Sequence, residues 1–126
     1  MKETQGRQFT KKGEPMSKFK PRLSRDDATA QADMFRVLRN KTRLRIIDLL
    51  SRYGGLLCVA EIADVLGEHP SVISNHLALL RAVELVSRGT YGSYAYYTLA
   101  QGALSRYTQS LAQLAASPEG EEESHA

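Results

Sequence analysis

Short polar side chains share one face of the helical pattern in residues 70–84. Ser71, Ser74 and Asn75, together with the small Ala78, fall opposite the apolar positions of this segment. Such side chains can approach phosphates and the edges of DNA bases closely, and their hydroxyl and amide groups can hydrogen-bond to both. A helix that merely belongs to a small core would show the same pattern, so both interpretations stay open at this point.

Cys58 is the one cysteine of the chain, so its chemistry is that of a lone thiol. An internal disulfide and most thiolate-only metal sites are excluded. Because Cys58 lies near the expected start of a helix, where amide dipoles favour a thiolate, a redox switch by sulfenylation or an intersubunit disulfide is one hypothesis. Its apolar neighbours Leu57 and Val59 favour the alternative, a buried small side chain.

The three histidines, His69, His76 and His125, show no metal-ligand spacing among themselves. His69 precedes Pro70, where a helix N-cap belongs, and we expect a local hydrogen bond there. His76 flanks the apolar positions of its helix, which favours a supporting role over a contact with a base. His125 follows a run of glutamates and could contribute only adventitiously to metal binding.

Two helical patterns separated by one glycine position these residues. The first has apolar positions at Ala60, Ile62, Ala63, Val65 and Leu66, and the second at Ile73, Leu77 and Leu80. Gly67 suits the left-handed turn that ends one helix, and Pro70 fits the first position of the next. The spacing predicts a helix-turn-helix, which projects its second helix into the major groove of DNA.

Two further helices are expected before this pair, over residues 25–38 and 41–52. Ser24 and Asp27 resemble a capping box, and Asn40 can cap the second helix. The apolar face of the first helix is expected at Ala28, Ala32, Phe35 and Leu38. The second is expected to bury Leu44, Ile46, Ile47, Leu49 and Leu50. Arg43 and Arg45 lie off this stripe, available to solvent or phosphate.

A β-hairpin and a last helix follow the helix-turn-helix. Residues 85–89 and 93–99 are rich in β-branched and aromatic residues and flank an expected tip at 90–92. Residues 100–116 repeat Leu104, Tyr107, Leu111 and Leu114 at a 3-4-3 spacing, like the seam of a coiled coil. The order α-α-α-α-β-β-α predicts a mainly α winged helix-turn-helix with a small β-hairpin.

Charge is distributed unevenly around this domain, which we place at residues 23–117. Residues 1–22 carry a local charge of +5 and show no helical or strand period, so we expect a disordered basic arm that could touch DNA. Residues 118–126 carry a local charge of −4 and are expected to form a disordered acidic tail. Met16 could be an alternative start. The absence of a secretory signal or a long apolar run favours the cytoplasm.

Four motifs in order resemble the ArsR/SmtB family of bacterial repressors. They are FRVLRNKTRLRIIDLL at 35–50, LLCVAEIADVLG at 56–67, PSVISNHLALLRAVELV at 70–86 and RGTYGSYAYYTL at 88–99. The resemblance implies a winged-helix homodimer whose first and last helices pair across a two-fold axis. The interface is then expected at Phe35, Leu38, Leu104, Tyr107, Leu111 and Leu114, although these residues could instead pack on their own domain.

The resemblance also implies which residues contact DNA. Ser71, Ser74 and Asn75 are the expected contacts of the recognition helix, and an asparagine amide can pair bidentately with adenine. His76 occupies the histidine position of the family motif. Arg88 and Tyr91 on the wing can reach phosphate or the minor groove. Arg43, Arg45, Arg81 and Arg88 would supply part of the attraction to phosphate.

The metal sites of the family do not survive in this sequence. Cys58 matches the first cysteine of the family's Cys-x-Cys, but Ala60 replaces the second. The last-helix site of the family uses Asp and His, and residues 101–116 contain no His, Asp or Glu. We therefore expect neither a metal nor another cofactor.

These observations predict a sequence-specific transcriptional repressor that binds a palindromic operator as a homodimer and is released by an unidentified signal. A thiol-responsive repressor acting through Cys58 is one alternative. A sequence-nonspecific architectural DNA-binding protein and a protein-interaction winged helix are the others. We expect no enzyme, because the sequence shows neither a nucleophile–base pair nor a glycine loop that would hold phosphate.

Overall fold

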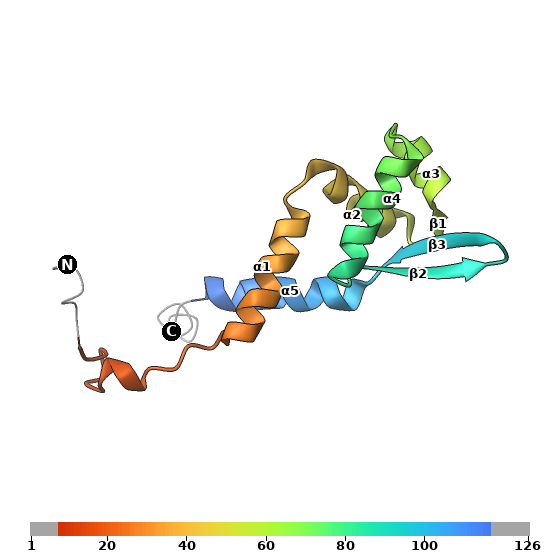
Figure 1. Cartoon of the computed structure of the whole chain (residues 1–126). Helices are drawn as coiled ribbons and strands as arrows, with labels where there is room; N and C mark the ends of the chain where they lie inside the picture. The colour runs from red at the N-terminus through yellow and green to blue at the C-terminus, as the bar shows by residue number, and fades with distance from the viewer. Residues whose placement is uncertain (1–7, 117–126) are drawn as a thin grey trace. The chain divides into compact units, whose positions relative to one another are not determined.

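A computed structural model describes residues 8–116, and Figure 1 shows its helices and strands. The elements are a 3-10 helix at Met16–Lys18, α1 Arg25–Leu38, α2 Lys41–Tyr53, β1 Leu57–Cys58, α3 Val59–Leu66, α4 Pro70–Ala82, β2 Val86–Tyr91, β3 Tyr94–Leu99 and α5 Gln101–Ala115. This order confirms the mainly α winged helix that the sequence predicts. The chain forms two compact units, residues 1–30 and 31–126, and the domain bounds expected at residues 23 and 117 stay a prediction.

The first unit has local structure where the sequence predicts disorder. Phe9 and Pro15 form an isolated antiparallel bridge, followed by the 3-10 helix. The turn between Phe9 and Pro15 forms because Thr10 Oγ1 accepts the amide of Glu14 at 3.2 Å and Gly13 adopts a φ of 88°, which glycine tolerates. Residues 1–7 and the expected acidic tail at 118–126 lie outside the described residues.

Helix α1 begins as predicted but buries a different face. The Asp27 amide donates to Ser24 Oγ at 3.1 Å, which provides half of the expected capping box. The buried residues are Gln31, Met34 and Val37. Ala32 and Phe35, expected on the apolar face, are exposed in the single chain, while Leu38 packs against the core. The pairing of that apolar face with a second copy stays a prediction, and the sequence pattern did not identify Gln31, Met34 and Val37 as the residues buried against the domain's own core.

Helix α2 has the predicted ends and a narrower buried stripe than predicted. Asn40 Oδ1 accepts the amides of Thr42 and Arg43 at 2.9 and 3.1 Å, and Gly54 ends the helix in the left-handed conformation. Ile46 and Leu50 are buried, whereas Leu44 is 50% exposed. Five apolar positions cover too wide an arc for one interface, so Leu44 remains outside it.

The helix-turn-helix consists of α3 and α4. Gly67 ends α3 at a φ of 70°, Pro70 begins α4, and His69 Nδ1 accepts the Ser71 amide at 3.2 Å, as the sequence predicts. Ile73, Leu77 and Leu80 are fully buried.

Two expectations for this pair are corrected. In α3 only Ile62 and Ala63 are buried, while Ala60 and Val65 are exposed. Helix α4 ends at Ala82, before the expected residue 84, because Glu84 adopts a φ of 62° and the Leu85 amide turns back to the Leu80 carbonyl.

The sheet has three antiparallel strands in the order β1-β3-β2, one more than the hairpin predicts. Leu57 pairs with Tyr97 and Cys58 with Tyr96. The β2–β3 hairpin closes at the pair Tyr91–Tyr94, so its tip is residues 92–93 and not 90–92. Gly92, with a φ of 62°, provides the left-handed residue that such a two-residue turn requires.

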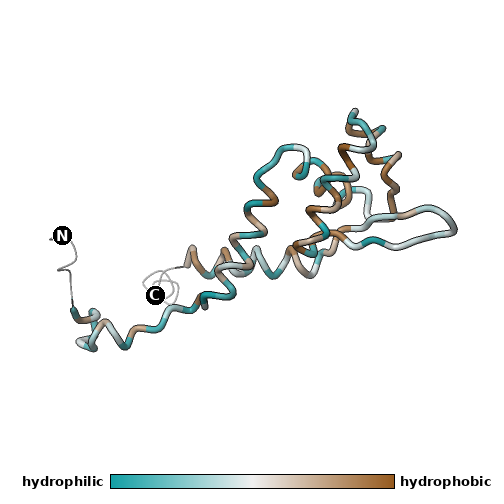
Figure 2. Tube along the Cα trace, in the orientation of Figure 1, coloured by the Kyte–Doolittle hydropathy of each residue, from teal (hydrophilic) through white to brown (hydrophobic). Residues whose placement is uncertain are grey.

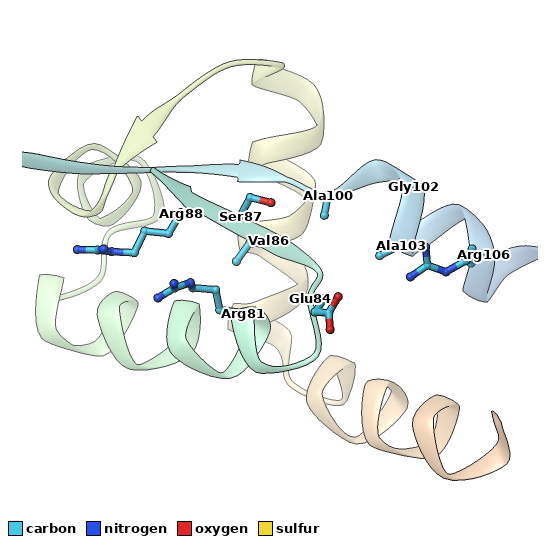
Figure 3. A pocket seen from close by; sticks show the side chains of 9 residues that line it. All are labelled: Arg81, Glu84, Val86, Ser87, Arg88, Ala100, Gly102, Ala103 and Arg106. Carbon is cyan, nitrogen blue, oxygen red and sulfur yellow. The ribbon is translucent and has the colours of Figure 1, made fainter. Parts of the chain in front are cut away.

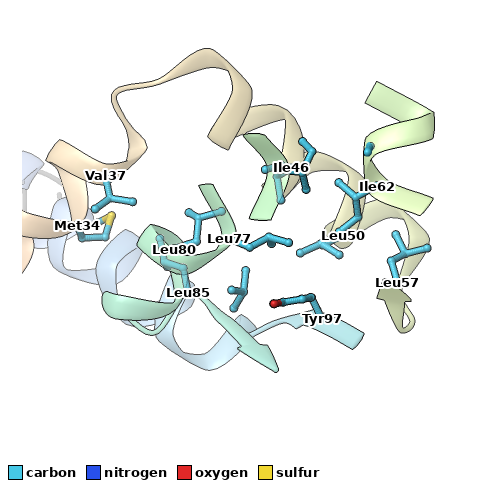
Figure 4. Packing of buried hydrophobic residues seen from close by; sticks show 13 residues of the cluster. Met34, Val37, Ile46, Leu50, Leu57, Ile62, Leu77, Leu80, Leu85 and Tyr97 are labelled. Atoms are coloured by element: carbon cyan, nitrogen blue, oxygen red, sulfur yellow. The ribbon is translucent and has the colours of Figure 1, made fainter. Parts of the chain in front are cut away.

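One hydrophobic core holds these elements together, and side chains from α1, α2, α4 and β3 converge in it (Figure 4). Figure 2 shows that hydrophobic residues recur along α2, α3 and α4 between hydrophilic ones. Tyr97 of β3 is buried, and its partners on the same strand face, Ala95 and Leu99, pack against the core. Helix α5 contributes Ala103, Leu104 and Tyr107.

Candidate nucleic-acid interface

Helix α4 presents the short polar side chains away from the core. Ser71, Ser74, Asn75 and Ala78 are all exposed, opposite the fully buried Ile73, Leu77 and Leu80. Within the described residues, Ser74 and Asn75 form no side-chain hydrogen bond to the protein. Ser71 Oγ lies 2.9 Å from His69 Nδ1, so this hydroxyl is held at the start of the helix. The structure therefore brings these four residues together on one solvent-facing surface.

His76 lies at the edge of this surface and contacts α2. Its Nδ1 lies 3.2 Å from Arg43 Nη1. Burial lowers the pKa of His76, the nearby Arg43 guanidinium lowers the pKa further, and Glu68 opposes both effects. A neutral imidazole can accept a hydrogen bond from Arg43, so the geometry matches the supporting role that the sequence favours.

Arg43 is less available to a phosphate than the sequence predicts. It is half-buried, and its Nε donates to the Val37 carbonyl at 2.5 Å in addition to the His76 contact. His76 lies 33 residues from Arg43 in the sequence, so a helical pattern within α2 could not predict that these two side chains meet. Arg45 is exposed, and its Nη1 reaches the Leu66 carbonyl at the end of α3 at 3.4 Å, a long contact.

The wing, which is the β2–β3 hairpin, exposes the other residues that are predicted to contact DNA. After Val86, every residue of β2 is exposed, including Arg88 and Tyr91. Tyr91 is 72% exposed, and its ring packs edge-on against Tyr96 with the ring centroids 6.3 Å apart. Arg81, at the end of α4, extends its side chain in the same direction as Arg88 in Figure 3. Helix α4 and the wing thus place polar and basic groups on neighbouring elements.

Cys58 is half-buried at the N-cap of α3, as predicted, and its amide donates to Glu61 Oε1 at 2.9 Å. Between residues 8 and 116, no three His, Cys, Asp or Glu side chains lie close enough together to hold a metal ion. In the same part of the chain, no helix is both long and apolar enough to cross a membrane.

The predicted dimer residues fall into two groups. Leu38, Leu104 and Tyr107 pack against the core of their own domain. Phe35, Leu111 and Leu114 are 39%, 42% and 53% exposed. Helices α1 and α5 are joined by a polar contact that the sequence does not indicate. The buried Gln31 of α1 donates from Nε2 to Ser110 Oγ of α5 at 2.6 Å.

Comparisons with known proteins agree with this geometry. Residues 40–88 match the family model described as "Bacterial regulatory protein, arsR family". The chain is 35% identical over 78 residues to the transcriptional repressor SmtB homolog of Synechocystis sp., a match that covers 62% of this chain and only 58% of that protein. It is 33% identical over 67 residues to the transcriptional repressor SdpR of Bacillus subtilis, which covers 53% of this chain and 72% of SdpR.

The fold has a counterpart among solved structures. An ArsR-like transcriptional regulator from Rhodococcus sp. RHA1 superposes with a TM-score of 0.65 at 23% identity, covering 71% of this chain and 83% of that chain. This likeness concerns the fold, and the sequence relatives carry the family assignment.

Proposed function

The chain belongs to the ArsR family of bacterial regulatory proteins, and on this premise we propose that it is a DNA-binding transcriptional repressor that acts as a homodimer on a palindromic operator. The family consists of regulators and not of enzymes, in agreement with the sequence. Cytoplasmic localisation is part of the same proposal, because a repressor must reach the chromosome.

The surface of α4 is the observation that carries the proposal. Its inner face is fixed by three fully buried side chains, so Ser74 and Asn75 are held outward on a rigid element with their polar groups unpaired within the described residues. A recognition helix needs this combination, because base contacts require side chains whose position is set before binding. Ser71 at the first turn suits a phosphate contact.

The wing and the arginines add electrostatic attraction. Arg45, Arg81 and Arg88 are exposed, and Tyr91 near the tip is mostly solvent-accessible. Each arginine that neutralises a phosphate releases counterions, so the affinity should fall steeply with salt. Arg43 is less suited to a phosphate contact than its sequence position indicates, because its guanidinium already contacts Val37 and His76.

A homodimer would cover the apolar side chains that α1 and α5 leave exposed. Phe35, Leu111 and Leu114 are only partly covered within the described part of their own domain. A second copy that buries them on a two-fold axis would relate two α4 helices by that axis, as a palindromic operator requires.

The test of the DNA assignment is the double variant Ser74→Ala/Asn75→Ala. Duplexes enriched from a random library by the full chain would serve as the specific DNA, and unselected duplexes as the reference. We expect the variant to lose its preference for the enriched duplexes while its circular dichroism stays unchanged. Ser105→Ala/Gln109→Ala, an exposed polar pair on α5, is the control.

Three outcomes would contradict the proposal. Retained selectivity in the double variant would mean that α4 does not read the sequence. A wild-type protein without any preference between the two DNA pools would indicate an architectural protein. Absence of salt-dependent DNA affinity would indicate a winged helix that binds other proteins.

A thiol-responsive repressor is the second candidate, because Cys58 caps the helix directly before the recognition helix. Mobility-shift assays with peroxide, and separately with metal ions, would be compared between the wild type and Cys58→Ser. Loss of DNA binding under peroxide that requires Cys58 would support this candidate. Metal-induced release that persists in Cys58→Ser would instead show a metal site outside this cysteine.

A further inference from the structure

An open groove lies where the end of α4, the start of β2 and the start of α5 meet (Figure 3). Its volume is about 560 Å³, within the range of about 300–1,000 Å³ that is typical of small-molecule sites. The side chains and backbone that matter for its chemistry are Arg81, Glu84, Ser87, Arg88, Gly102 and Arg106. Sequence reasoning did not identify Arg106, because nothing in the pattern of α5 relates it to α4.

The groove carries an excess of positive charge. Arg81, Arg88 and Arg106 come from three different elements, and Glu84 is the one carboxylate among the lining residues. None of these four side chains forms an ion pair within residues 8–116. Arg36 and Arg52, by contrast, each pair with an aspartate at 2.9 Å on their own helix. Glu84 offsets only one of the three positive charges, so the lining keeps a net charge of +2 (three arginines minus one glutamate), which attracts an anion.

The amino-terminal end of α5 adds to this positive field. Its N-cap residue, Ala100, offers no side-chain cap, and the first turn contains no acidic residue. The first amides of this helix therefore lack the carboxylate or hydroxyl that commonly pairs with them. Gly102 lines the groove at this end, and a Cβ built there would meet nothing within 4 Å. A ligand can thus approach the backbone closely.

The walls of the groove are held by the core and by backbone hydrogen bonds. The Leu85 amide donates to the Leu80 carbonyl at 3.0 Å, and the Ala100 amide donates to the Leu85 carbonyl at 2.9 Å. Two of the lining residues, Val86 and Ala103, are buried, and so are the neighbouring core residues Leu80 and Leu85. The three arginines are therefore anchored on fixed backbone positions around the groove.

We propose that this groove binds a phosphate group. Arginine forms bidentate hydrogen bonds to phosphate oxygens, and a helix amino terminus favours the same anion. Glu84 disfavours a bare anion but can accept a hydrogen bond from a hydroxyl group next to the phosphate. The phosphate can belong to the DNA backbone or to a free phosphorylated compound. The first identification rests on the proposed function, and the second does not.

The first arm of the test uses no DNA. Inorganic pyrophosphate is titrated into the full chain by isothermal calorimetry at constant ionic strength, with chloride as the balancing anion. We expect saturable binding of one pyrophosphate per chain and a Kd about tenfold higher for Arg106→Gln, since the variant loses a charge-assisted hydrogen bond to the anion. Arg52→Gln, an exposed arginine on α2, should leave the Kd unchanged.

The second arm measures the affinity for a duplex as a function of salt. If a backbone phosphate occupies the groove, Arg106→Gln should reduce the slope of log K against log salt by about 1, and Arg52→Gln should not. Saturable pyrophosphate binding with an unchanged slope supports a free phosphorylated ligand. A reduced slope without pyrophosphate binding supports the DNA backbone.

The proposal is overturned if pyrophosphate binds no better than chloride and the slope of Arg106→Gln equals that of Arg52→Gln. This result is distinct from failure of the proposed function. A wild-type chain that binds no DNA would refute the repressor assignment, while the calorimetric arm would still decide whether the groove accepts phosphate.

Discussion

At the scale of single residues, Asn40 shows how one side chain fixes the start of a helix. Its Oδ1 accepts two backbone amides, those of Thr42 and Arg43, which otherwise have no intrahelical partner. We expect Asn40→Ala to lower the free energy of unfolding by about 1 kcal/mol. Urea unfolding with an unchanged m-value would measure this loss. Asn75→Ala, an exposed asparagine within α4, should change the stability much less.

His76 gives stability a defined dependence on pH. Burial and the Arg43 charge lower the pKa of His76 in the folded state below its ordinary value of 6.5. The unfolded chain therefore takes up the proton first as the pH falls, so the contribution of His76 is complete above about pH 6.5 and declines below it until the folded-state pKa is reached. An NMR titration should place the midpoint of His76 below 6.5.

The matched variant for this effect is His76→Gln, which keeps a hydrogen-bond acceptor but does not titrate. Between pH 7.5 and pH 5.5, the urea midpoint of the wild type should fall more than that of the variant. If the urea midpoints of the two proteins fell equally between these pH values, the His76–Arg43 contact would not be coupled to protonation.

Residue-level features were predictable where the contact is local and missed where it is not. The caps at Asn40, Gly67 and His69 follow from residue types within four positions of a helix end. The Arg43–His76 and Gln31–Ser110 contacts join residues 33 and 79 positions apart, and they depend on how the helices pack. A sequence pattern contains no information on such pairs.

At the scale of elements, hydrophobic periodicity predicted the helices well and the sheet incompletely. The limits of α1 were predicted at 25–38 and are Arg25–Leu38. Strand β1 contains only two residues, too few to show an alternation, and it exists because it pairs with Tyr96 and Tyr97 of β3. Periodicity also predicted buried faces that are too wide, since it cannot tell which apolar positions meet a neighbour.

Gly67 at the end of α3 and Gly102 in the first turn of α5 should respond oppositely to alanine. Gly67 has a φ of 70° and open space around its Cα, so Gly67→Ala costs only backbone strain, about 1 kcal/mol of stability. Gly102 lies in the first turn of α5 in equally open space without a positive φ. Gly102→Ala should stabilise the fold by about 0.5 kcal/mol, because alanine lowers the entropy of the unfolded chain.

Thermal and urea unfolding of both variants would check this pair. If Gly67→Ala proved neutral, the α3–α4 turn would have to tolerate a change of conformation, and DNA binding by that variant should then be altered as well. A loss of stability in Gly102→Ala would contradict the open surroundings of this residue.

At the scale of the whole molecule, the element order and the α4 surface were predictable, while the distribution of exposed apolar side chains was not. The seam from Leu104 to Leu114 appears continuous in the sequence. In the structure its first half packs against the core and its second half is exposed. Only the tertiary fold reveals that Leu111 and Leu114 remain exposed and could contact a second copy of the chain. Substitutions at these two positions therefore test the proposed dimer without changing the core.

We therefore expect Leu111→Glu/Leu114→Glu to dissociate the homodimer and leave each domain folded. Both side chains are 42% or more exposed, so glutamate replaces them at no cost to the core but introduces charge where two copies would meet. Sedimentation velocity should show a monomer, and the affinity for a two-half-site duplex should fall toward that for a single half-site. Val65→Glu, at an apolar position of α3 that is 60% exposed, should remain dimeric. A double variant that still sediments as a dimer would place the interface elsewhere.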